Sequence, residues 1–464
     1  MKKVSRLFFL TVLVATILFG ACKKDKEDST TETDPGVFSG SIAIYSSAND
    51  TTLKNFLEGD YHTISGSLML YTSDAIDYGK YLVNLKKVGG SVKLYKIPNA
   101  DLSFIKTVTR ISSTLQISAC PNLVSLEGVN NLDTLGNLFI DQNPKIKNLK
   151  GLEKVKTITD LTVYASPAFE SFEGLSSLTT VKGNFSVTKN SSLISFAGFS
   201  SLTEITGNIS VAENEMLKSV DGLNKLKTVG GTIVMNSLPE LSDLKALVNL
   251  SDTVVALNLT GLPKLSNLTG LDSIPVISTD LVISNCNILG NLNGLTRLDS
   301  IGGRFELSKL SALSAFNGLP KLKYIRKDFR VAECNALASF PGLTRLDSIG
   351  GNLVINDNAA LKNLNGFSAT KTIRGKLLIL ENDNLQSLDG LELLRNVRSD
   401  IEIYYNSSLK SYCGIKDVKL IGTAYISLNG YSPTWGQITG GQCSNSNRLT
   451  HHKRNRYKGG FFVL

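Results

Sequence analysis

The chain has 464 residues, with 49 Lys and Arg against 40 Asp and Glu and a formal net charge of +9. The six Cys form no CxxC or CxxxC pair, which argues against a zinc site, and three His are too few to suggest a multi-His metal site. We therefore expect no metal and no cofactor. Taken alone, the positive charge is typical of a protein with an anionic partner such as nucleic acid.

The positive charge lies mainly at the two ends of the chain. Neither residues 1–22 nor residues 444–464 contain an acidic residue, and their basic residues are Lys2, Lys3 and Arg6, then Arg448, Lys453, Arg454, Arg456 and Lys458. Subtracting these charges leaves about +1 for residues 23–443. The body of the chain is therefore close to neutral, and we do not expect nucleic acid as its partner.

Residues 1–22 are predicted to be a lipoprotein signal peptide. A basic start leads into an apolar run from Leu7 to Phe19, which is too short to span a bilayer and is typical of a secretory signal. The segment Leu18-Phe19-Gly20-Ala21-Cys22 resembles a bacterial lipobox, although Phe19 stands where Leu is usual. The resemblance implies that Cys22 is lipidated and becomes the new N-terminus. The alternative is a plain signal peptide with an incidental Cys.

Residues 23–40 are predicted to be a polar tether, because they begin with a Lys/Asp/Glu cluster and continue with Ser, Thr and Glu. A charged cluster directly after the lipidated Cys resembles the surface-export signal of Bacteroidota lipoproteins. This implies an outer-membrane protein, held to the membrane by its lipid and exposed at the cell surface. The alternative is a simple soluble linker.

An internal repeat of about 24 residues fills residues 41–443. Each unit begins with an apolar residue, and these predicted starts are Ile42, Leu68, Val92, Leu115, Leu138, Leu161, Phe185, Ile209, Ile233, Leu257, Leu281, Phe305, Phe329, Leu353, Leu377, Ile401 and Tyr425. In a typical unit Leu353 and Ile355 alternate with polar residues, which predicts a short strand with one buried face. Leu361 and Leu364 then follow at a spacing of three, which suits a coil that turns corners.

No single coil of this kind buries its apolar side chains alone, so stacking must do so. We therefore predict one β solenoid of about 17 coils with one long parallel sheet, in place of the three domains that the length suggests. A recurrent Gly supports the prediction, because it marks a corner that needs positive φ or has no space for a Cβ. It recurs at Gly128, Gly151, Gly174, Gly198, Gly222, Gly270, Gly294, Gly318, Gly342, Gly366, Gly390 and Gly414, and only Ala246 breaks the column.

The Gly-Asn-Leu-x-Ile start of the unit at Gly351, together with the Leu-x-x-Leu-x-Gly-Leu segment of other units such as residues 385–391, resembles the receptor L domain and, more broadly, leucine-rich repeats. Receptor L domains occur in growth-factor receptor ectodomains and in Bacteroidota surface lipoproteins. The resemblance covers residues 41–443. It implies a right-handed solenoid that binds a ligand or partner and does no catalysis, but it does not identify the ligand.

The position five residues after each strand start holds Asn or Cys in most coils, and stacked Asn side chains there are expected to bond neighbouring backbones. Cys120, Cys286 and Cys334 fall in this column and are expected to be buried turn residues. Cys413 and Cys443 lie in contexts that resemble the C-terminal end of the bacterial L-domain proteins. The resemblance implies a disulfide between them, with two free thiols as the alternative.

Outward positions of the first strands carry Tyr45, Tyr71 and Tyr95, which predicts an aromatic strip at the N-terminal end. Tyr suits stacking on sugars or anchoring a protein partner, so these three are the candidate ligand-binding residues. The alternative is a self-stacking ladder that stabilises the end coils.

Parallel solenoids also accommodate polysaccharide lyases and hydrolases, whose sites need a compact cluster of acids, Arg or Lys. Here Asp and Glu are spread singly along the turns, so we expect no enzyme and no catalytic residues. The predicted function is a monomeric, lipid-anchored surface module for binding or adhesion, with a protein or glycan ligand. The alternative is a glycan-capturing lipoprotein of a carbohydrate-uptake system. Residues 444–464 are expected to be a basic, disordered tail.

Overall fold

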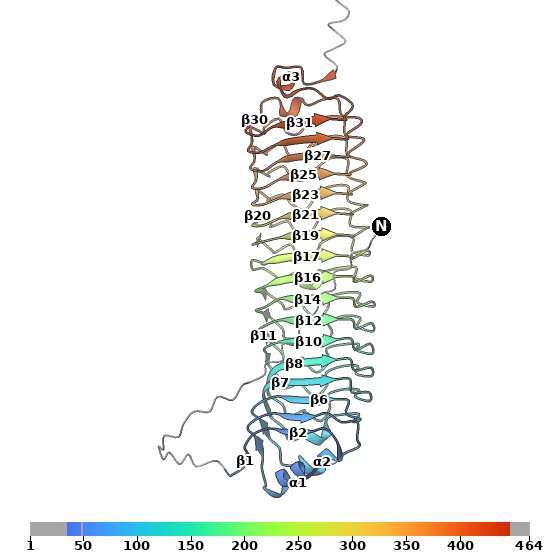
Figure 1. The fold of residues 1–464 in the computed structure, drawn as a ribbon, viewed down its shortest axis with the longest axis vertical. Coiled ribbons are helices and arrows are strands. Elements are labelled where there is room, and N and C mark those ends of the chain that lie inside the picture. The colour runs from blue at the N-terminus through green and yellow to red at the C-terminus, as the bar shows by residue number, and fades with distance from the viewer. Residues whose placement is uncertain (1–34, 48–49, 446–464) are drawn as a thin grey trace, which may run out of the picture. The chain divides into compact units, whose positions relative to one another are not determined.

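A computed structural model of the chain describes residues 35–47 and 50–445. The compact unit begins at Gly36 and is a mostly β parallel solenoid of about 16 turns with a period of about 24 residues (Figure 1). The predicted signal peptide with Cys22, most of the predicted tether and residues 446–464 of the predicted tail lie outside the described residues.

One strand from each coil stacks in parallel on the next in a 20-stranded sheet, called here the long sheet. These strands are β2 (Ile42–Ile44), β4 (Leu68–Leu70), β6 (Val92–Tyr95), β7 (Arg110–Ser118), β8 (Thr134–Asp141), β10 (Leu161–Tyr164), β12 (Phe185–Thr188), β14 (Ile209–Ala212), β16 (Thr232–Asn236), β17 (Ala256–Thr260), β19 (Leu281–Ser284), β21 (Phe305–Ser308), β23 (Phe329–Ala332), β25 (Leu353–Asn356), β27 (Leu377–Leu380), β29 (Ile401–Tyr404) and β31 (Ala424–Ser427).

A second ladder of two-residue strands runs along another side of the coils. Its first members, β1 (Val37–Phe38), β3 (Thr63–Ile64) and β5 (Lys87–Val88), belong to the long sheet, because β7 is long enough to pair with both β5 and β6. The later members form two separate sheets. They are β9 (Thr157–Ile158), β11 (Thr180–Val181), β13 (Glu204–Ile205) and β15 (Thr228–Val229), then β18 (Val276–Ile277), β20 (Ser300–Ile301), β22 (Tyr324–Ile325), β24 (Ser348–Ile349), β26 (Thr372–Ile373), β28 (Asn396–Val397) and β30 (Lys419–Leu420).

The parallel register confirms the predicted strand starts from Ile42 to Ile401, since each pairs with the next along the long sheet. The prediction for the last coil is wrong. Ile401 pairs with Ala424, one residue before the predicted Tyr425. The final step is one residue shorter than the 24-residue steps from Leu161 to Ile401, so Ala424 and Ile426 pack against the core and Tyr425 is exposed.

The fold also extends slightly beyond the predicted limits of 41 and 443. Residues 37–38, which were assigned to the tether, form β1 and pair with β3. At the other end Ser444 bridges to Ser411, and the backbone N–H of Asn445 donates to the Lys410 carbonyl at 3.1 Å.

The core is a continuous column of apolar side chains that point inward from every coil. In β25 Leu353 and Ile355 are fully buried, and their neighbours in the strand are half-buried. Phe replaces the usual aliphatic residue in two groups of adjacent coils, for example Phe305 and Phe329, whose rings stack at 4.9 Å. Because no coil covers its own apolar face, each depends on its neighbours for burial.

The recurrent glycines mark corners where adjacent coils nearly touch. From Gly128 to Gly390 they have φ between +107° and +124°, a region that only glycine adopts readily. At Gly366 a Cβ would also overlap the Phe340 carbonyl of the preceding coil. Ala246 fits the column because its coil turns through a short 3₁₀ helix, η3 (Lys245–Leu247), instead.

A second left-handed position directly follows most strands of the long sheet, and there φ is only +47° to +68°. Asn, Lys, Glu, Ser and Ala all occupy it. The two left-handed corners therefore differ in what they demand, since this one tolerates a side chain and the glycine corner does not.

Buried amides connect successive coils through what we call the amide ladder. Asn382 illustrates one step: its Oδ1 accepts from the Asn358 backbone N–H at 3.0 Å, and its Nδ2 donates to the carbonyls of Ile355 and Leu380 at 3.0 and 2.8 Å. The ladder has two runs, of which one comprises Cys120, Asn143, Ser166, Asn190 and Asn214 and the other Cys334, Asn358, Asn382, Asn406 and Asn429. It confirms the predicted bonding between stacked Asn side chains.

Several of these regular features are interrupted in the same middle coils. Leu238 and Leu262 replace the amides, and Ala246 replaces the corner glycine. The second ladder stops at β15 and resumes at β18, with one isolated bridge between Val254 and Ile277 in the gap. The long sheet alone continues through this region, by the pairing of β16 with β17 and β17 with β19.

Both ends of the core are covered. At the N-terminal end, helix α1 (Asp50–Glu58) buries Leu53 and Phe56, and α2 (Tyr78–Tyr81) packs near it. At the other end, α3 (Trp435–Thr439) begins with a capping box between Thr434 and Gln437 and buries Ile438. Covering the ends keeps the last apolar side chains from water and hinders association between molecules.

We predict that Asn382→Leu lowers the free energy of unfolding by about 3 kcal/mol or more, because it leaves buried backbone groups of two coils without a partner. Asn384→Ala is the matched control, since Asn384 bonds the Ala359 carbonyl at an exposed site and should cost about 1 kcal/mol or less. Urea denaturation of both variants measures the difference. Equal losses would contradict a stabilising role for the buried ladder.

Candidate binding surface

The outer face of the long sheet carries the residues predicted to bind a ligand. Tyr45 and Tyr71 directly follow β2 and β4, and Tyr95 ends β6. They therefore occupy the same outward position in three adjacent coils, and we call them the tyrosine strip. Tyr45 is 61% exposed and Tyr95 41% exposed, while Tyr71 between them is half-buried.

The three rings contact one another in sequence. The ring centroids of Tyr45 and Tyr71 are 5.6 Å apart, and those of Tyr71 and Tyr95 are 6.3 Å apart. The Lys96 ammonium lies 5.0 Å from the Tyr95 centroid, which is within cation–π range. The strip is thus one continuous aromatic surface, and its internal contacts are also those of a stabilising ladder.

Burial raises the pKa of Tyr71, and the neighbouring Tyr45 raises it further. Its phenol therefore stays protonated at neutral pH and remains a hydrogen-bond donor. In the turn beyond the strip, the Ser47 backbone N–H donates to Asp74 Oδ2 at 2.6 Å and lowers the pKa of that carboxyl. An aromatic surface with a nearby ionised carboxylate suits a neutral or cationic group of a ligand.

The same sheet face has a second aromatic group at its C-terminal end, and one of its members, Tyr425, was not predicted to face outward. Tyr404 lies near Tyr425, which is 47% exposed, and Tyr405 and Leu428 occupy the left-handed turn position of adjacent coils. The one-residue shift of the last coil concealed Tyr425, which had been assigned to the core.

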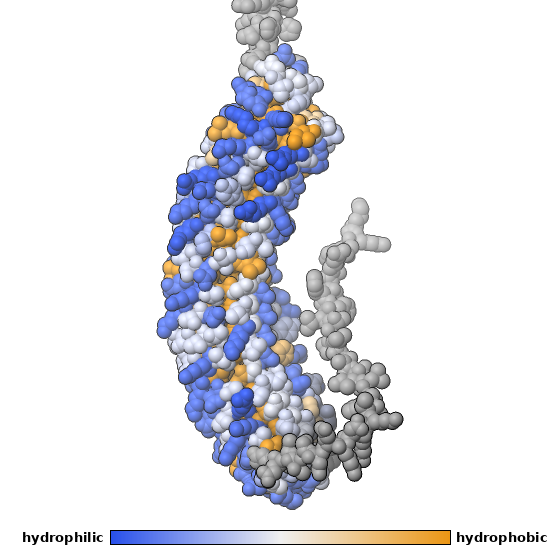
Figure 2. All heavy atoms as spheres, turned by 90° about the vertical axis from the view of Figure 1, so that its left-hand side faces the viewer, coloured by the Kyte–Doolittle hydropathy of each residue, from blue (hydrophilic) through white to orange (hydrophobic). Residues whose placement is uncertain are grey.

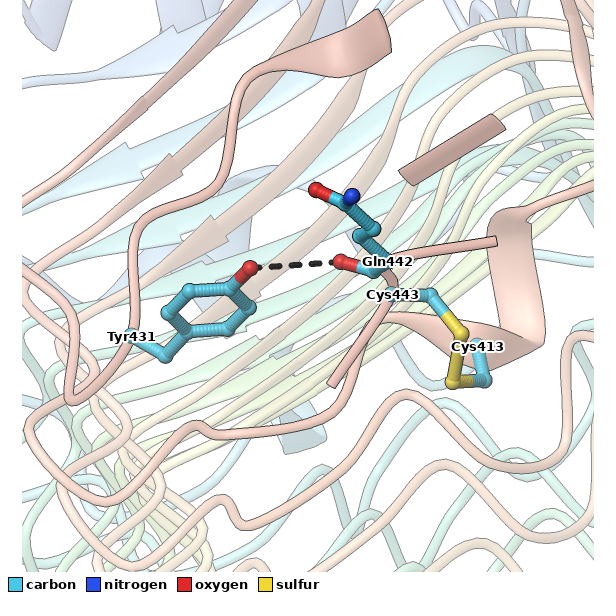
Figure 3. Close-up of a disulfide and its surroundings, with 4 residues drawn as sticks. All are labelled: Cys413, Tyr431, Gln442 and Cys443. Atoms are coloured by element: carbon cyan, nitrogen blue, oxygen red, sulfur yellow. Dashed lines mark hydrogen bonds between the residues drawn. A yellow bond between two sulfur atoms is a disulfide. The ribbon is translucent and has the colours of Figure 1, made fainter. Parts of the chain in front are cut away.

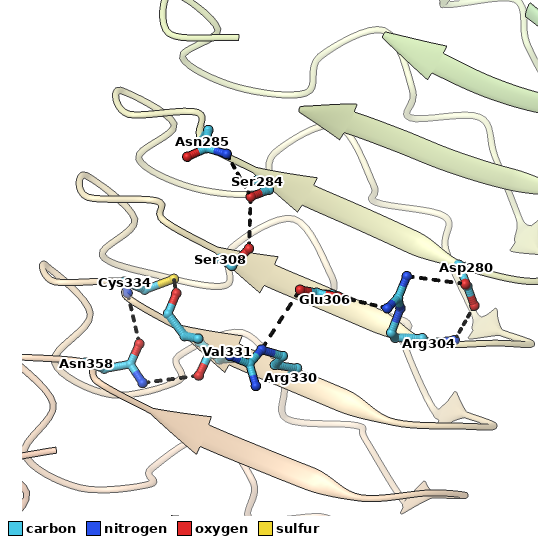
Figure 4. A network of polar contacts seen from close by, with 11 residues as sticks. Asp280, Ser284, Asn285, Arg304, Glu306, Ser308, Arg330, Val331, Cys334 and Asn358 are labelled. Carbon is cyan, nitrogen blue, oxygen red and sulfur yellow. Dashed lines mark hydrogen bonds and ion pairs between the residues drawn. The ribbon is translucent and has the colours of Figure 1, made fainter. Parts of the chain in front are cut away.

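Between these ends the outer face carries ion pairs (Figure 4). Glu306 lies 3.2 Å from Arg304 and 3.9 Å from Arg330, and Arg304 also reaches Asp280 at 3.7 Å. Farther along, Lys376 contacts Asp400 at 3.0 Å and Glu402 at 2.8 Å, and these contacts raise its pKa, Glu402 most strongly. These carboxylates face cations rather than one another, and such exposed pairs contribute little stability.

Cys413 and Cys443 form the disulfide that the resemblance implied (Figure 3). Beside it the Tyr412 backbone N–H donates to the Cys443 carbonyl at 2.8 Å, and the Tyr431 hydroxyl donates to the Gln442 carbonyl at 3.2 Å. Together with these hydrogen bonds, the disulfide holds the segment after α3 against the coil that begins with β29.

The other described cysteines, Cys120, Cys286 and Cys334, are fully buried in the ladder column, as predicted. Burial raises the pKa of Cys120 and Cys286 to about 11 and that of Cys334 to about 12. They therefore remain thiols at neutral pH, which makes them unreactive.

Over residues 35–47 and 50–445, no group of three or more His, Cys, Asp or Glu side chains is arranged to hold a metal ion. Within the same part of the chain, no helix has the length and apolar character needed to cross a bilayer. No known family model matches the chain, and a comparison with curated proteins finds no relative.

We predict that iodoacetamide at pH 8 leaves Cys120, Cys286 and Cys334 unmodified in the folded chain and modifies all three once guanidinium unfolds it. Because their pKa values are raised, the thiolate forms only as the pH approaches 11 to 12. Peptide mass spectrometry reads the labelling, and Cys413 and Cys443 should react only after reduction. Rapid labelling of the folded chain at pH 8 would refute this description.

Proposed function

We propose that the chain is a lipid-anchored, cell-surface binding or adhesion module without catalytic activity, built on a right-handed solenoid of the receptor L-domain or leucine-rich-repeat kind. The observation that carries the proposal is the tyrosine strip, an exposed aromatic surface on an extended sheet. Exposed aromatic groups of this kind are typical of contact sites for proteins and glycans.

The anchor part of the proposal depends on Cys22 and the segment around it. The tether would hold the solenoid away from the membrane and leave the outer face of the long sheet accessible. Each outward strand position recurs once in every coil, so the same surface position repeats along the long sheet. A ligand lying along the sheet could therefore contact several coils at once. An extended surface of this kind suits an elongated glycan or a protein partner.

We predict that Cys22→Ser abolishes incorporation of labelled fatty acid and releases the chain from the membrane fraction of expressing bacteria. Cys120→Ser is the control, since Cys120 is buried in the fold and should leave both readouts unchanged. Equal membrane retention of the Cys22 variant would leave a plain signal peptide as the better interpretation.

For the strip, we predict that Tyr45→Ser/Tyr71→Ser/Tyr95→Ser weakens binding to array-displayed glycans or surface proteins by at least about tenfold. The control, Tyr164→Ser/Tyr404→Ser/Tyr425→Ser, changes the same sheet face outside the strip and should retain binding. Glycan hits would favour the carbohydrate-uptake role, and protein hits alone would favour adhesion.

Thermal unfolding of the same variants separates the two roles of the strip. Loss of the ring contacts should cost about 0.5–1.5 kcal/mol for each pair. A destabilised strip variant with unchanged binding would reduce the strip to a structural ladder. Release of product from a polysaccharide substrate would contradict the absence of catalysis.

A further inference from the structure

A row of arginines runs along the second ladder in the C-terminal coils. The backbone N–H groups of Arg326, Arg374 and Arg398 donate to Ile301, Ile349 and Ile373 at 2.9 to 3.0 Å, which places the three at the same position of their coils. Gly350 occupies this position between Arg326 and Arg374 and donates in the same way to Ile325. We call Arg326, Arg374 and Arg398 the arginine row. Figure 2 looks onto this side of the solenoid, where hydrophilic side chains gather on the C-terminal coils.

The arginine row has no acidic partner. All three side chains are exposed, and across residues 35–47 and 50–445 none of their guanidinium groups forms an ion pair or a side-chain hydrogen bond. The neighbouring column behaves differently, because Asp and Lys alternate there. Lys323 pairs with Asp299 at 3.9 Å and Lys371 with Asp347 at 2.8 Å.

Spacing along the solenoid makes the row a regular array of charge. Stacked strands lie about 4.8 Å apart, so Arg374 and Arg398 are about one strand spacing apart and Arg326 and Arg374 about two. The net charge of residues 23–443 is close to zero and gives no sign of this array, because acidic residues elsewhere balance the arginines. The array is confined to the C-terminal coils, since Lys182 is the one basic residue at this position among β9 to β15.

Between the first two arginines lies a notch of about 410 Å³, lined by Tyr324, Ile325, Arg326, Ser348, Gly350 and Arg374. Gly350 is needed for the close approach of the coils, since a Cβ there would overlap the Arg326 carbonyl. Its missing side chain leaves room between the two guanidinium groups. Tyr324, 40% exposed, supplies a flat aromatic wall.

A line of hydroxyl and amide groups runs beside the row. The register of the second ladder aligns Tyr324 with Ser348, Ser348 with Thr372 and Thr372 with Asn396. Guanidinium groups bind carboxylate or sulfate in a bidentate manner, hydroxyl and amide groups bond sugar hydroxyls, and an aromatic face packs against the C–H face of a sugar ring. We propose that the notch and the arginine row bind an acidic oligosaccharide, through its carboxylate or sulfate groups.

Single-stranded nucleic acid fits this surface less well. Such sites combine a basic groove with successive aromatic side chains on which bases stack. Here Tyr324 has no aromatic neighbour along the line, because the aligned positions are Ser348, Thr372 and Asn396. The site is separate from the tyrosine strip, which lies in the first three coils, so the two can be tested independently.

Isothermal titration calorimetry on the full chain tests the proposal with four probes: a heparin-derived oligosaccharide, an oligogalacturonate, a neutral malto-oligosaccharide and single-stranded DNA. We predict salt-dependent binding of at least one of the two acidic sugars and none of the neutral sugar. Arg326→Ser/Arg374→Ser should weaken that binding by at least about tenfold. The two acidic probes distinguish sulfate from carboxylate as the recognised group.

Two control variants separate the site from net charge. Lys156→Ser/Lys182→Ser removes the same charge near β9 and β11 and should leave affinity within about twofold. Arg326→Lys/Arg374→Lys keeps the charge but loses the planar guanidinium group that bonds a carboxylate or sulfate through two N–H groups, and should bind more weakly than the wild type. The triple tyrosine-strip variant should bind the acidic sugar as the wild type does, so failure of the strip proposal would not affect this result.

The proposal is overturned if neither acidic sugar binds, if the lysine control loses as much affinity as the arginine variant, or if the Arg→Lys variant binds as the wild type does. Tighter binding of DNA than of either acidic sugar would likewise overturn it. The substituted Arg and Lys side chains are exposed, so circular dichroism should give the wild-type thermal unfolding curve for each of the arginine and lysine variants.

Discussion

The close approach of one backbone to the next determines most of this structure. Each coil lies one strand spacing from its neighbours. Its strands and amide ladder form hydrogen bonds with the backbone of the adjacent coil, and its glycine corner leaves room for that backbone to approach. The glycine at Gly366 shows the constraint most directly, because the Phe340 carbonyl occupies the place of a side chain. Each coil must therefore bring its strand, ladder residue and corner back into register with the coil before it, which keeps the repeat at 23 or 24 residues from Leu68 onward.

This constraint explains why the sequence predicts so much of the fold. Inward positions must be apolar and corner positions must be glycine, so Leu353, Ile355 and Gly366 reveal their roles through spacing alone. The final coil is the exception. The step into it breaks the unbroken series of 24-residue steps from Leu161 to Ile401, and the coil is held by α3 and a disulfide, so extrapolating the 24-residue period misplaced Tyr425.

The binding surfaces were predicted less completely, because the fold constrains outward residues far less. The tyrosine strip was recognisable, since three identical residues recur at consecutive repeats. The arginine row recurs at multiples of the same period but skips the coil of Gly350, and a total charge near zero gave no reason to seek it. Whether a charged residue has a partner is a property of neighbouring columns, which only the structure brings together.

The interruption in the middle coils gives the solenoid an internal boundary. On either side, a run of the amide ladder and a section of the second ladder join the coils into a block, and the long sheet with its apolar core connects the two blocks. The stability of such a solenoid is approximately the sum of the free energies of the contacts between adjacent coils. Local stability is therefore lowest where adjacent coils share the fewest kinds of contact. The tyrosine strip and the arginine row lie in different blocks, so partial unfolding at this boundary would leave each surface on its own intact half.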